Sequence, residues 1–294
     1  MRPLRYLIVS GSAAAMAGAV AFSGVTATTV AAPARAGHAP SVRFPAEART
    51  ALAHRLRHNH PQAILLHPGR AHAINGVTAA GSYNWSGYAD TATKAQTFTK
   101  VSGSWTAPSL TCTREDQITS NWVGLDGFNN NSVEQLGTYA QCFKGAPVYF
   151  TWFEMVPAGV KVKGTTLQPG DKITASVTRS GTSYTLKLTD STHAANSFSV
   201  TKTCALATCK DTSAEWISER PSFASPFGIV PQARYNAFKI TNGTETANGT
   251  AGTIGTGPGV NAITMVDATS TYKLNTVSAL TGGNSFSTTW RNSY

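Results

Sequence analysis

Short stretches of alternating hydrophobic and polar residues follow one another from about Ser82 to the end of the chain. Thr, Ser, Val, Tyr and Trp dominate these stretches, and Gly, Pro or Asn recurs between them. The pattern predicts strands at Thr97–Trp105, Ser120–Leu125, Pro147–Val156, Lys172–Arg179, Ser183–Leu188, Ser197–Lys202, Ala214–Ser218, Tyr235–Ile240, Ala262–Val266 and Ser285–Trp290. Regular short strands with turn signals are typical of an antiparallel sandwich or barrel, so we expect one all-β domain at residues 79–294. The Gly/Thr-rich segment 242–259 is expected to be a long loop.

Alternation also predicts which side chains share a face, because successive residues of a strand point to opposite sides. The sets predicted to share a face are Trp122, Gly124 and Asp126; Phe150, Trp152, Glu154 and Val156; and Ser213, Glu215, Ile217 and Glu219. Each set mixes carboxylates with apolar side chains. A buried face carries a carboxylate only where it is paired or functional. The alternative is that these faces meet water, as on an ordinary half-exposed strand.

The first part of the chain differs from the rest. Arg2 and Arg5 precede an apolar stretch rich in small residues, and small-x-small cleavage sites follow it, which indicates a secretory signal peptide at residues 1–36. Residues 37–78 resemble a basic pro-segment, in which Ala46–His58 is expected to form a helix that ends at Pro61. The pro-segment is expected either to dock on an acidic cleft or to be a solvated linker.

Charge is concentrated in the same region. Residues 1–82 hold eight arginines and one glutamate, whereas residues 83–294 hold sixteen Lys and Arg against thirteen Asp and Glu. The body is therefore close to neutral, and it shows no stripe of basic and aromatic residues, so neither nucleic acid nor, after signal removal, a membrane is expected as a partner.

The four cysteines all lie in the body. Export makes two disulfides the expectation, and three pairings are possible. Cys204–Cys209 would close a tight loop and Cys112–Cys142 would join the other two, and this pairing is favoured. Neither Cys-x-x-Cys nor the histidine spacing of a zinc site is present, so no metal or other cofactor is expected.

Histidine is nearly absent from the body, where only His193 lies after residue 82. His193 occurs in a polar turn, which disfavours a serine-protease triad. Any catalytic base is therefore expected to be a carboxylate.

Several motifs, in order along the chain, resemble the glutamic peptidases, or eqolisins, a family of secreted acid endopeptidases. They are NWSGY at 84–88, VSGSW at 101–105 with Pro108, NWVGLDG at 121–127, EQLG at 134–137, YFTWFEMVP at 149–157 and AEWI at 214–217. Each motif alone is weak, but their joint order is specific. The spacing from Asp126 to Gln135, the cysteine positions and the slightly basic body depart from the fungal members.

The resemblance implies a jelly-roll-like, concanavalin A-like β-sandwich of two curved sheets with a cleft on one of them. It implies Gln135 and Glu215 as the catalytic pair, with Trp122, Asp126 and Glu154 around the cleft. Glu215 would then take a proton from the attacking water and return it to the leaving amine, while Gln135 would donate a hydrogen bond to the oxyanion. Glu219, outside this set, is expected to be a surface partner of Arg220 or of another basic residue.

The sequence therefore predicts a secreted, monomeric endopeptidase that acts on proteins or peptides in acid. Two alternatives remain at this point. A glycosidase could use Glu215 and Glu154 as its acid and nucleophile, and a lectin-like sandwich could bind sugar through its aromatic residues.

Overall fold

The computed structural model describes residues 63–65, 73–74, 76–223 and 228–292. The predicted signal peptide and the predicted helix Ala46–His58 lie outside these residues. The predicted boundary between pro-segment and body, at residue 79, falls inside the strand β2 (Val77–Ser82) and stays a prediction. Among the described residues, no helix is long and apolar enough to cross a membrane.

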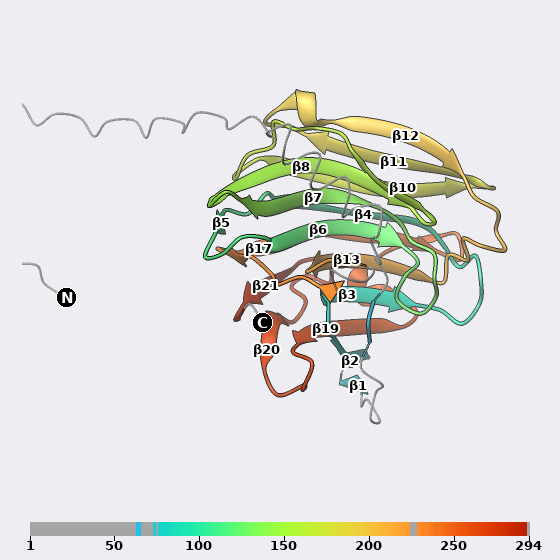
Figure 1. Ribbon diagram of the computed structural model, residues 1–294. Helices are drawn as coiled ribbons and strands as arrows, with labels where there is room; N and C mark the ends of the chain where they lie inside the picture. The colour runs from blue at the N-terminus through green and yellow to red at the C-terminus, as the bar shows by residue number, and fades with distance from the viewer. Residues whose placement is uncertain (1–62, 66–72, 75, 224–227, 293–294) are drawn as a thin grey trace, which may run out of the picture. The chain divides into compact units, whose positions relative to one another are not determined.

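Two antiparallel layers form the described fold (Figure 1). The strands of the first layer, in hydrogen-bonded order, are β9 (Ala158–Val162), β8 (Ala146–Met155), β7 (Glu134–Phe143), β6 (Ile118–Leu125), β13 (Ser213–Glu219), β3 (Trp85–Thr91) and β19 (Val260–Val266). Next to β19 lie β2, in parallel, and β20 (Lys273–Val277), followed by β21 (Phe286–Trp290). The short β1 (Ala73–Ile74) pairs with β2.

The strands of the second layer, in order, are β12 (Phe198–Thr203), β11 (Ser183–Asp190), β10 (Lys172–Ser180), β4 (Phe98–Thr106), β17 (Phe238–Ala247) and β18 (Thr250–Thr253). The two layers are joined through β17, which pairs with β4 over most of its length and with β21 at its start. Two further pairs of short strands are β14 (Ser222–Phe223) with β15 (Gly228–Ile229), and β5 (Leu110–Thr111) with β16 (Arg234–Tyr235). Two 3₁₀ turns are present, η1 (Ala194–Asn196) and η2 (Ile254–Thr256).

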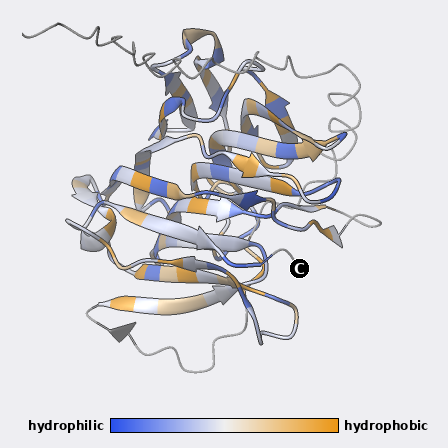
Figure 2. Ribbon diagram, turned by 90° about the vertical axis from the view of Figure 1, so that its left-hand side faces the viewer, coloured by the Kyte–Doolittle hydropathy of each residue, from blue (hydrophilic) through white to orange (hydrophobic). Residues whose placement is uncertain are grey.

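The main core lies between the layers. Side chains such as Val123, Leu136 and Trp216 of the first layer pack with Val177 and Leu186 of the second. Figure 2 shows the corresponding alternation of hydrophobic and hydrophilic residues along the strands. Alternation of this kind buries one face of each strand in the core and leaves the other face for a second environment.

The strand predictions are largely confirmed, because each predicted strand overlaps an observed one. The loop expected at 242–259 is wrong in its first half, since β17 and β18 form a hairpin there. The favoured disulfide pairing is confirmed, because Cys112 is bonded to Cys142 and Cys204 to Cys209.

Candidate active site

One face of the first layer, on the side away from the second layer, carries most of the predicted site residues, and we call it the site face. Register places Glu215, Gly124, Gln135 and Glu154 side by side on β13, β6, β7 and β8. The next row on the same face contains Ile217, Trp122, Gly137 and Trp152, and the row after that begins with Glu219. The three predicted face-sharing sets therefore meet on neighbouring strands.

Two glycines make room for the Trp122 ring on this face. A Cβ atom on Gly137 would lie 2.6 Å from the Trp122 Cβ and 2.2 Å from the Asn121 carbonyl oxygen. A Cβ on Gly124 would lie 3.0 Å from the Trp122 ring and 3.0 Å from the Gln135 Cβ. The absence of both side chains lets the fully buried Trp122 lie between the row of Gln135 and the row of Glu219.

Gln135 is fixed by Glu154 on the adjacent strand. The Gln135 Nε2 donates a hydrogen bond of 2.8 Å to the Glu154 Oε2, and both side chains are buried. A primary amide has two N–H donors, and Glu154 accepts one of them. The second N–H is therefore available to a ligand on the site face.

Glu219 is held on the other side of Trp122. The Trp122 Nε1 donates a hydrogen bond of 2.8 Å to the Glu219 Oε2, and Trp85 packs edge-on against Trp122 with 4.8 Å between ring centroids. Burial raises the pKa of Glu219 to about 8, the negative charge of Glu154 adds to the increase, and the hydrogen bond from Trp122 opposes it. Glu219 is thus electrostatically connected to the carboxylate that holds Gln135.

This position corrects the expectation for Glu219. It is only 2% exposed, so it is not a surface partner of Arg220. Arg220 is itself buried, and its Nε donates a hydrogen bond of 2.6 Å to the Tyr83 carbonyl oxygen. Burial also lowers the pKa of Arg220 to about 10.

Glu215 has a different environment. Burial is the main cause that raises the pKa of Glu215 well above its ordinary value; Ser213 opposes the increase, and the negative charges of Asp126 and Asp90 add to it. Glu215 is completely buried, and among the described residues no hydrogen bond joins it to Gln135. Register brings Glu215 and Gln135 into one row with Gly124 between them, but their side-chain partners differ.

Asp126 organises loops at the end of β6. Its carboxylate accepts hydrogen bonds from the backbone N–H groups of Asp211 and Thr212, at 2.7 and 2.8 Å, and from the side chains of Asn130 and Ser132. Asp126 therefore joins the loop before β13 to the loop before β7. This positions the strands that carry Glu219 and Gln135.

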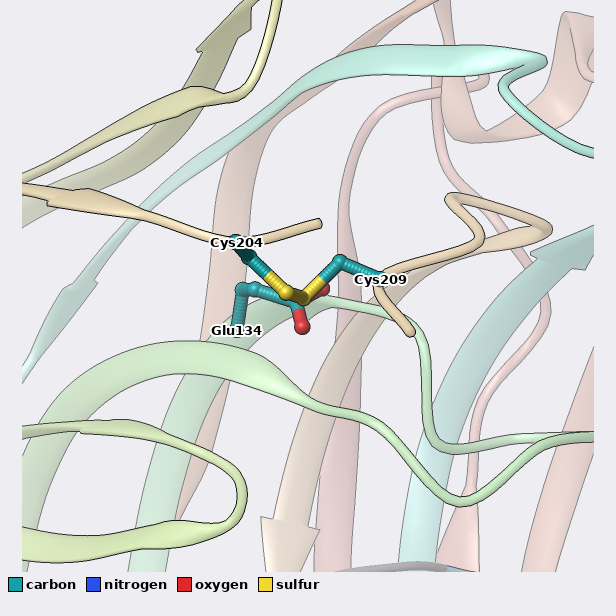
Figure 3. Close-up of side chains that lie close together, drawn as sticks. All are labelled: Glu134, Cys204 and Cys209. Atoms are coloured by element: carbon teal, nitrogen blue, oxygen red, sulfur yellow. A yellow bond between two sulfur atoms is a disulfide. The ribbon is translucent and has the colours of Figure 1, made fainter. Parts of the chain in front are cut away.

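Among the described residues, three groups of side chains have the spacing of metal ligands, and the two that contain Glu134 do not suit a metal ion. Glu134 lies next to Cys204 and Cys209, whose sulfur atoms are bonded to each other and hence are not thiolate ligands (Figure 3). Asp126, Glu134 and Asp211 also lie close together, but Asp211 already pairs with Arg179 at 3.0 Å. With Asp126 and Asp211 engaged by protein donors, only Glu134 would be free to bind an ion.

Residues 63–65 pack beside the site face. The Ala63 N–H donates to the Gly127 carbonyl at 3.0 Å, the Ile64 N–H donates to the Asn84 Oδ1 at 2.8 Å, and Leu65 forms a β-bridge with Ser82. Ala63 contacts the hydrophobic cluster that contains Trp85 and Trp122. A part of the predicted pro-segment thus lies against the same cluster as the candidate site.

One face of this antiparallel β-sandwich holds the Gln135 amide beside buried carboxyl groups, as the resemblance to the glutamic peptidases leads us to expect. The Peptidase A4 family model matches residues 83–290, so the chain belongs to the Peptidase A4 family and is a glutamic-type peptidase that acts on proteins or peptides. This family membership favours the peptidase interpretation over the glycosidase and lectin-like alternatives. No curated protein matches the chain.

Solved structures agree with the fold. Scytalido-glutamic peptidase with a transition state analog inhibitor is 23% identical, with a TM-score of 0.61 over 71% of this chain and 98% of that chain. SCP-B, a member of the eqolisin family in complex with the tripeptide Ala-Ile-His, is 22% identical with a TM-score of 0.57 over 71% and 98%. Aspergilloglutamic peptidase from Aspergillus niger is 24% identical with a TM-score of 0.51 over 60% and 100%. The predicted β-sandwich is therefore confirmed.

The sequence interpretation did not place Glu219 among the candidate site residues, although it lies on the site face. Part of the signal was present in the sequence, because alternation put Glu219 on the same face as Glu215, but only the structure shows that its strand pairs with the strand that carries Trp122. The adjacent Arg220 suggested an exposed ion pair instead. Only the packing of Trp85 and Trp122 around the carboxyl group shows that it is buried.

Proposed function

We propose that this peptidase is a secreted, acid-acting endopeptidase in which Gln135 stabilises the oxyanion and Glu219 is the general base, with the sequence-predicted Glu215 as the competing assignment. The observation that carries the proposal is that Gln135 and Glu219 are each fixed by a buried partner, Glu154 and Trp122, on the site face. The two disulfides and the predicted signal peptide support secretion.

In the proposed reaction, a water oxygen attacks the scissile carbonyl carbon while the Glu219 carboxylate takes one water proton. The free N–H of Gln135 donates to the oxygen that becomes negative. As the carbon–nitrogen bond breaks, Glu219 gives the proton to the leaving amine, so that an acid and an amine are formed and Glu219 is ionised again. An amide is neutral throughout the acid range, so it remains a donor at every working pH.

Glu219 is preferred over Glu215 because of its contacts. A hydrogen bond from Trp122 favours the ionised form of Glu219, which the base requires. Glu154, which holds Gln135, lies close enough for its negative charge to raise the pKa of Glu219, so Glu219 and Gln135 share one neighbour. Burial raises the pKa of Glu215 well above its ordinary value, a hydrogen bond from Ser213 opposes this increase, and the negative charges of Asp126 and Asp90 add to it.

The raised pKa of Glu219, about 8, is the expected property of an inactive, covered state. Burial is its largest cause, so contact with water would lower this pKa towards the ordinary value of about 4.3. The ionised base would then exist in mildly acidic medium. We propose that the pro-segment, of which residues 63–65 pack beside the site face, keeps the site covered until it is removed.

A first experiment tests the activity itself. The full chain, acid-treated to release the pro-segment, is incubated with denatured casein at several pH values between about 2 and 7, around the carboxyl pKa range, with and without a pepstatin-like inhibitor. We expect internal cleavage in acid that the inhibitor does not reduce. Release of terminal residues only, or no cleavage by the folded protein at any pH, would contradict the proposed endopeptidase.

A second experiment tests the pro-segment. A chain that lacks residues 1–78 is compared with the untreated full chain on the same casein substrate. The shorter chain should be active without acid treatment. Equal activity of the two forms at every pH would contradict the proposed covering role.

A further inference from the structure

The charges of the described residues are distributed very unevenly between interior and surface. Every lysine of the chain is exposed, whereas among the described carboxylates only Glu115 and Asp116 are exposed. Glu115 is further engaged by the backbone N–H groups of Lys144 and Gly145, at 2.8 and 2.7 Å. The surface is therefore much more cationic than the near-neutral composition of the body suggests.

The outer face of the second layer lacks exposed carboxylates altogether, and we call it the hydroxyl face. Register places Thr241, Ser104, Thr174 and Thr189 in one row across β17, β4, β10 and β11. The next rows contain Thr244, Ser102, Ser176, Lys187 and Ser199, and then Thr246, Lys100, Thr178, Thr185 and Thr201. The carboxylates of these strands, Asp190 and Glu245, point to the interior and are buried.

Neighbouring hydroxyl groups on this face are ordered by one another. The Ser102 and Thr244 hydroxyls lie 2.7 Å apart, and those of Ser104 and Thr174 lie 3.0 Å apart. Hydroxyl groups both donate and accept, so a row of them can bind the hydroxyl groups of a ligand in either sense. Lys100 and Lys187 add positive charge within the same grid.

One end of the hydroxyl face is hollowed. A hollow of about 400 Å³ is lined by Lys172 and Lys239, by hydroxyl residues such as Ser104, Thr174 and Thr241, and also by apolar residues such as Trp105, Ala107 and Pro108. The Lys172 Nζ donates a hydrogen bond of 2.9 Å to the Thr106 Oγ1, which holds the ammonium group at the hollow. Two lysines and several hydroxyl groups form a suitable environment for one anionic group on a hydroxylated ligand.

The types of side chain on this face indicate which class of negatively charged ligand it would bind. Single-stranded nucleic acid is bound through aromatic side chains on which bases stack, and none of the outward residues of these rows is aromatic. Membrane surfaces require apolar side chains that enter the interface, and these rows contain none. Hydroxyl groups and lysines together match a polymer that carries both hydroxyl groups and negative charges.

We propose that the hydroxyl face is a binding surface for an acidic polysaccharide, and that the hollow between Lys172 and Lys239 receives one of its anionic groups. Because the site face lies on the other side of the first layer, binding at the hydroxyl face would attach the peptidase to a polymer and leave the candidate active site free. This inference does not depend on the assignment of the catalytic residues.

The test uses the full chain and immobilised polygalacturonate at about pH 5.5, where its carboxyl groups are ionised, at low salt. The variant K100Q/K172Q/K187Q/K239Q removes four charges from the hydroxyl face. The matched control K94Q/K161Q/K210Q/K273Q removes four exposed lysines from elsewhere. Cooperative thermal unfolding of each variant shows that it is folded.

We expect the apparent dissociation constant of the hydroxyl-face variant to rise about tenfold or more, because each lost lysine contact removes a favourable ionic interaction with the polymer. The control should change much less. Equal weakening of both variants would mean that net charge alone causes binding, and it would overturn the proposal. Tighter binding of the wild type to DNA-cellulose or to anionic lipid vesicles than to polygalacturonate would overturn the assignment to a polysaccharide.

Discussion

The site face and the hydroxyl face are built from the same strand pattern but differ in the placement of charge. On the site face, Glu154, Glu215 and Glu219 are buried, and Trp122 donates a hydrogen bond to Glu219. On the hydroxyl face, the lysines are exposed, and the two carboxylates of its strands, Asp190 and Glu245, point to the interior instead. The comparison shows that strand alternation determines which side chains share a face. The residues that pack against this face then determine whether its side chains are buried or exposed to water.

The same contrast extends to protonation. Burial raises the pKa of Glu219 to about 8 and, together with Asp90, that of Glu245 to about 10. The exposed lysines carry their charge throughout the acid and neutral range. The buried carboxyl groups of the interior therefore change their protonation in a pH range in which the lysines of the hydroxyl face stay charged.

The largest effect in this comparison, apart from the base itself, is expected for Gln135 on the site face. Gln135→Ala removes the oxyanion donor and should reduce kcat about 100- to 1000-fold, measured with a peptide substrate in acid. Gln141→Ala is the control, since Gln141 lies on the same strand and the same face but further from Glu154. An equal loss in both variants would indicate a general disturbance of β7 and contradict the oxyanion role.

A smaller effect is expected for Trp122→Phe, which keeps a ring but removes the N–H that binds Glu219. Loss of this donor disfavours the ionised base, so the pKa of Glu219 should rise and the acidic limb of the kcat/KM profile should move to higher pH, with about tenfold lower activity at acid pH. Trp152→Phe is the control, because the Trp152 Nε1 has no hydrogen-bond partner. A uniform decrease without movement of the limb would contradict the assignment of Glu219.

The interior predicts a stability that depends on pH. Burial, together with the negative charges of Asp126, Asp211 and Glu215, raises the pKa of Glu134 well above its ordinary value, and neither of its carboxyl oxygens has a hydrogen-bond partner. A raised carboxyl pKa gives stability that is complete below the unfolded pKa of about 4.3 and is lost as the pH rises through the folded value. The wild type should therefore unfold at a lower temperature at pH 7 than at pH 4.

Glu134→Gln should remove part of the loss of stability that the wild type shows as the pH rises. We expect it to stabilise the protein more at pH 7 than at pH 4, measured by thermal unfolding. The exposed Glu115→Gln serves as a control for the loss of one negative charge from the protein. A Glu134→Gln effect that is the same at both pH values would show that Glu134 is not protonated in the fold.

The smallest effect concerns net charge. Burial raises the pKa of Asp211 to about 7 and that of Glu219 to about 8, so both are expected to be protonated in the folded protein at pH 6. The folded chain should bind several more protons than the unfolded chain at this pH, measured by difference titration on unfolding. Equal proton content in the two states would contradict the contrast between interior and surface.

Much of the fold could be predicted because the strands of the second layer have one buried and one exposed face. In β10, for example, Ile173, Ala175 and Val177 are buried and alternate with more exposed residues. The strand β7, which carries Gln135, was not predicted as a strand. Nearly all its residues are buried on both faces, so its sequence lacks a simple alternation of polar and apolar residues.

The candidate site could be predicted only in part. Motifs identified Gln135, and the structure places it in contact with Glu154, also predicted. The choice between Glu215 and Glu219 depends on tertiary contacts, because the two glutamates share one strand and one face. In the same way, composition suggested a near-neutral body, since it cannot show that most carboxylates are buried while the lysines are exposed.

The most direct measurement compares Glu219→Gln and Glu215→Gln on one internally quenched peptide, with both chains acid-treated and shown to be folded. Each change replaces a carboxyl group by an amide of similar size. The proposed mechanism predicts that Glu219→Gln reduces kcat/KM at least about 1000-fold, since it removes the base, whereas Glu215→Gln retains activity within about tenfold. Loss of activity in Glu215→Gln with activity retained in Glu219→Gln would contradict the account and establish the sequence-predicted residue as the base.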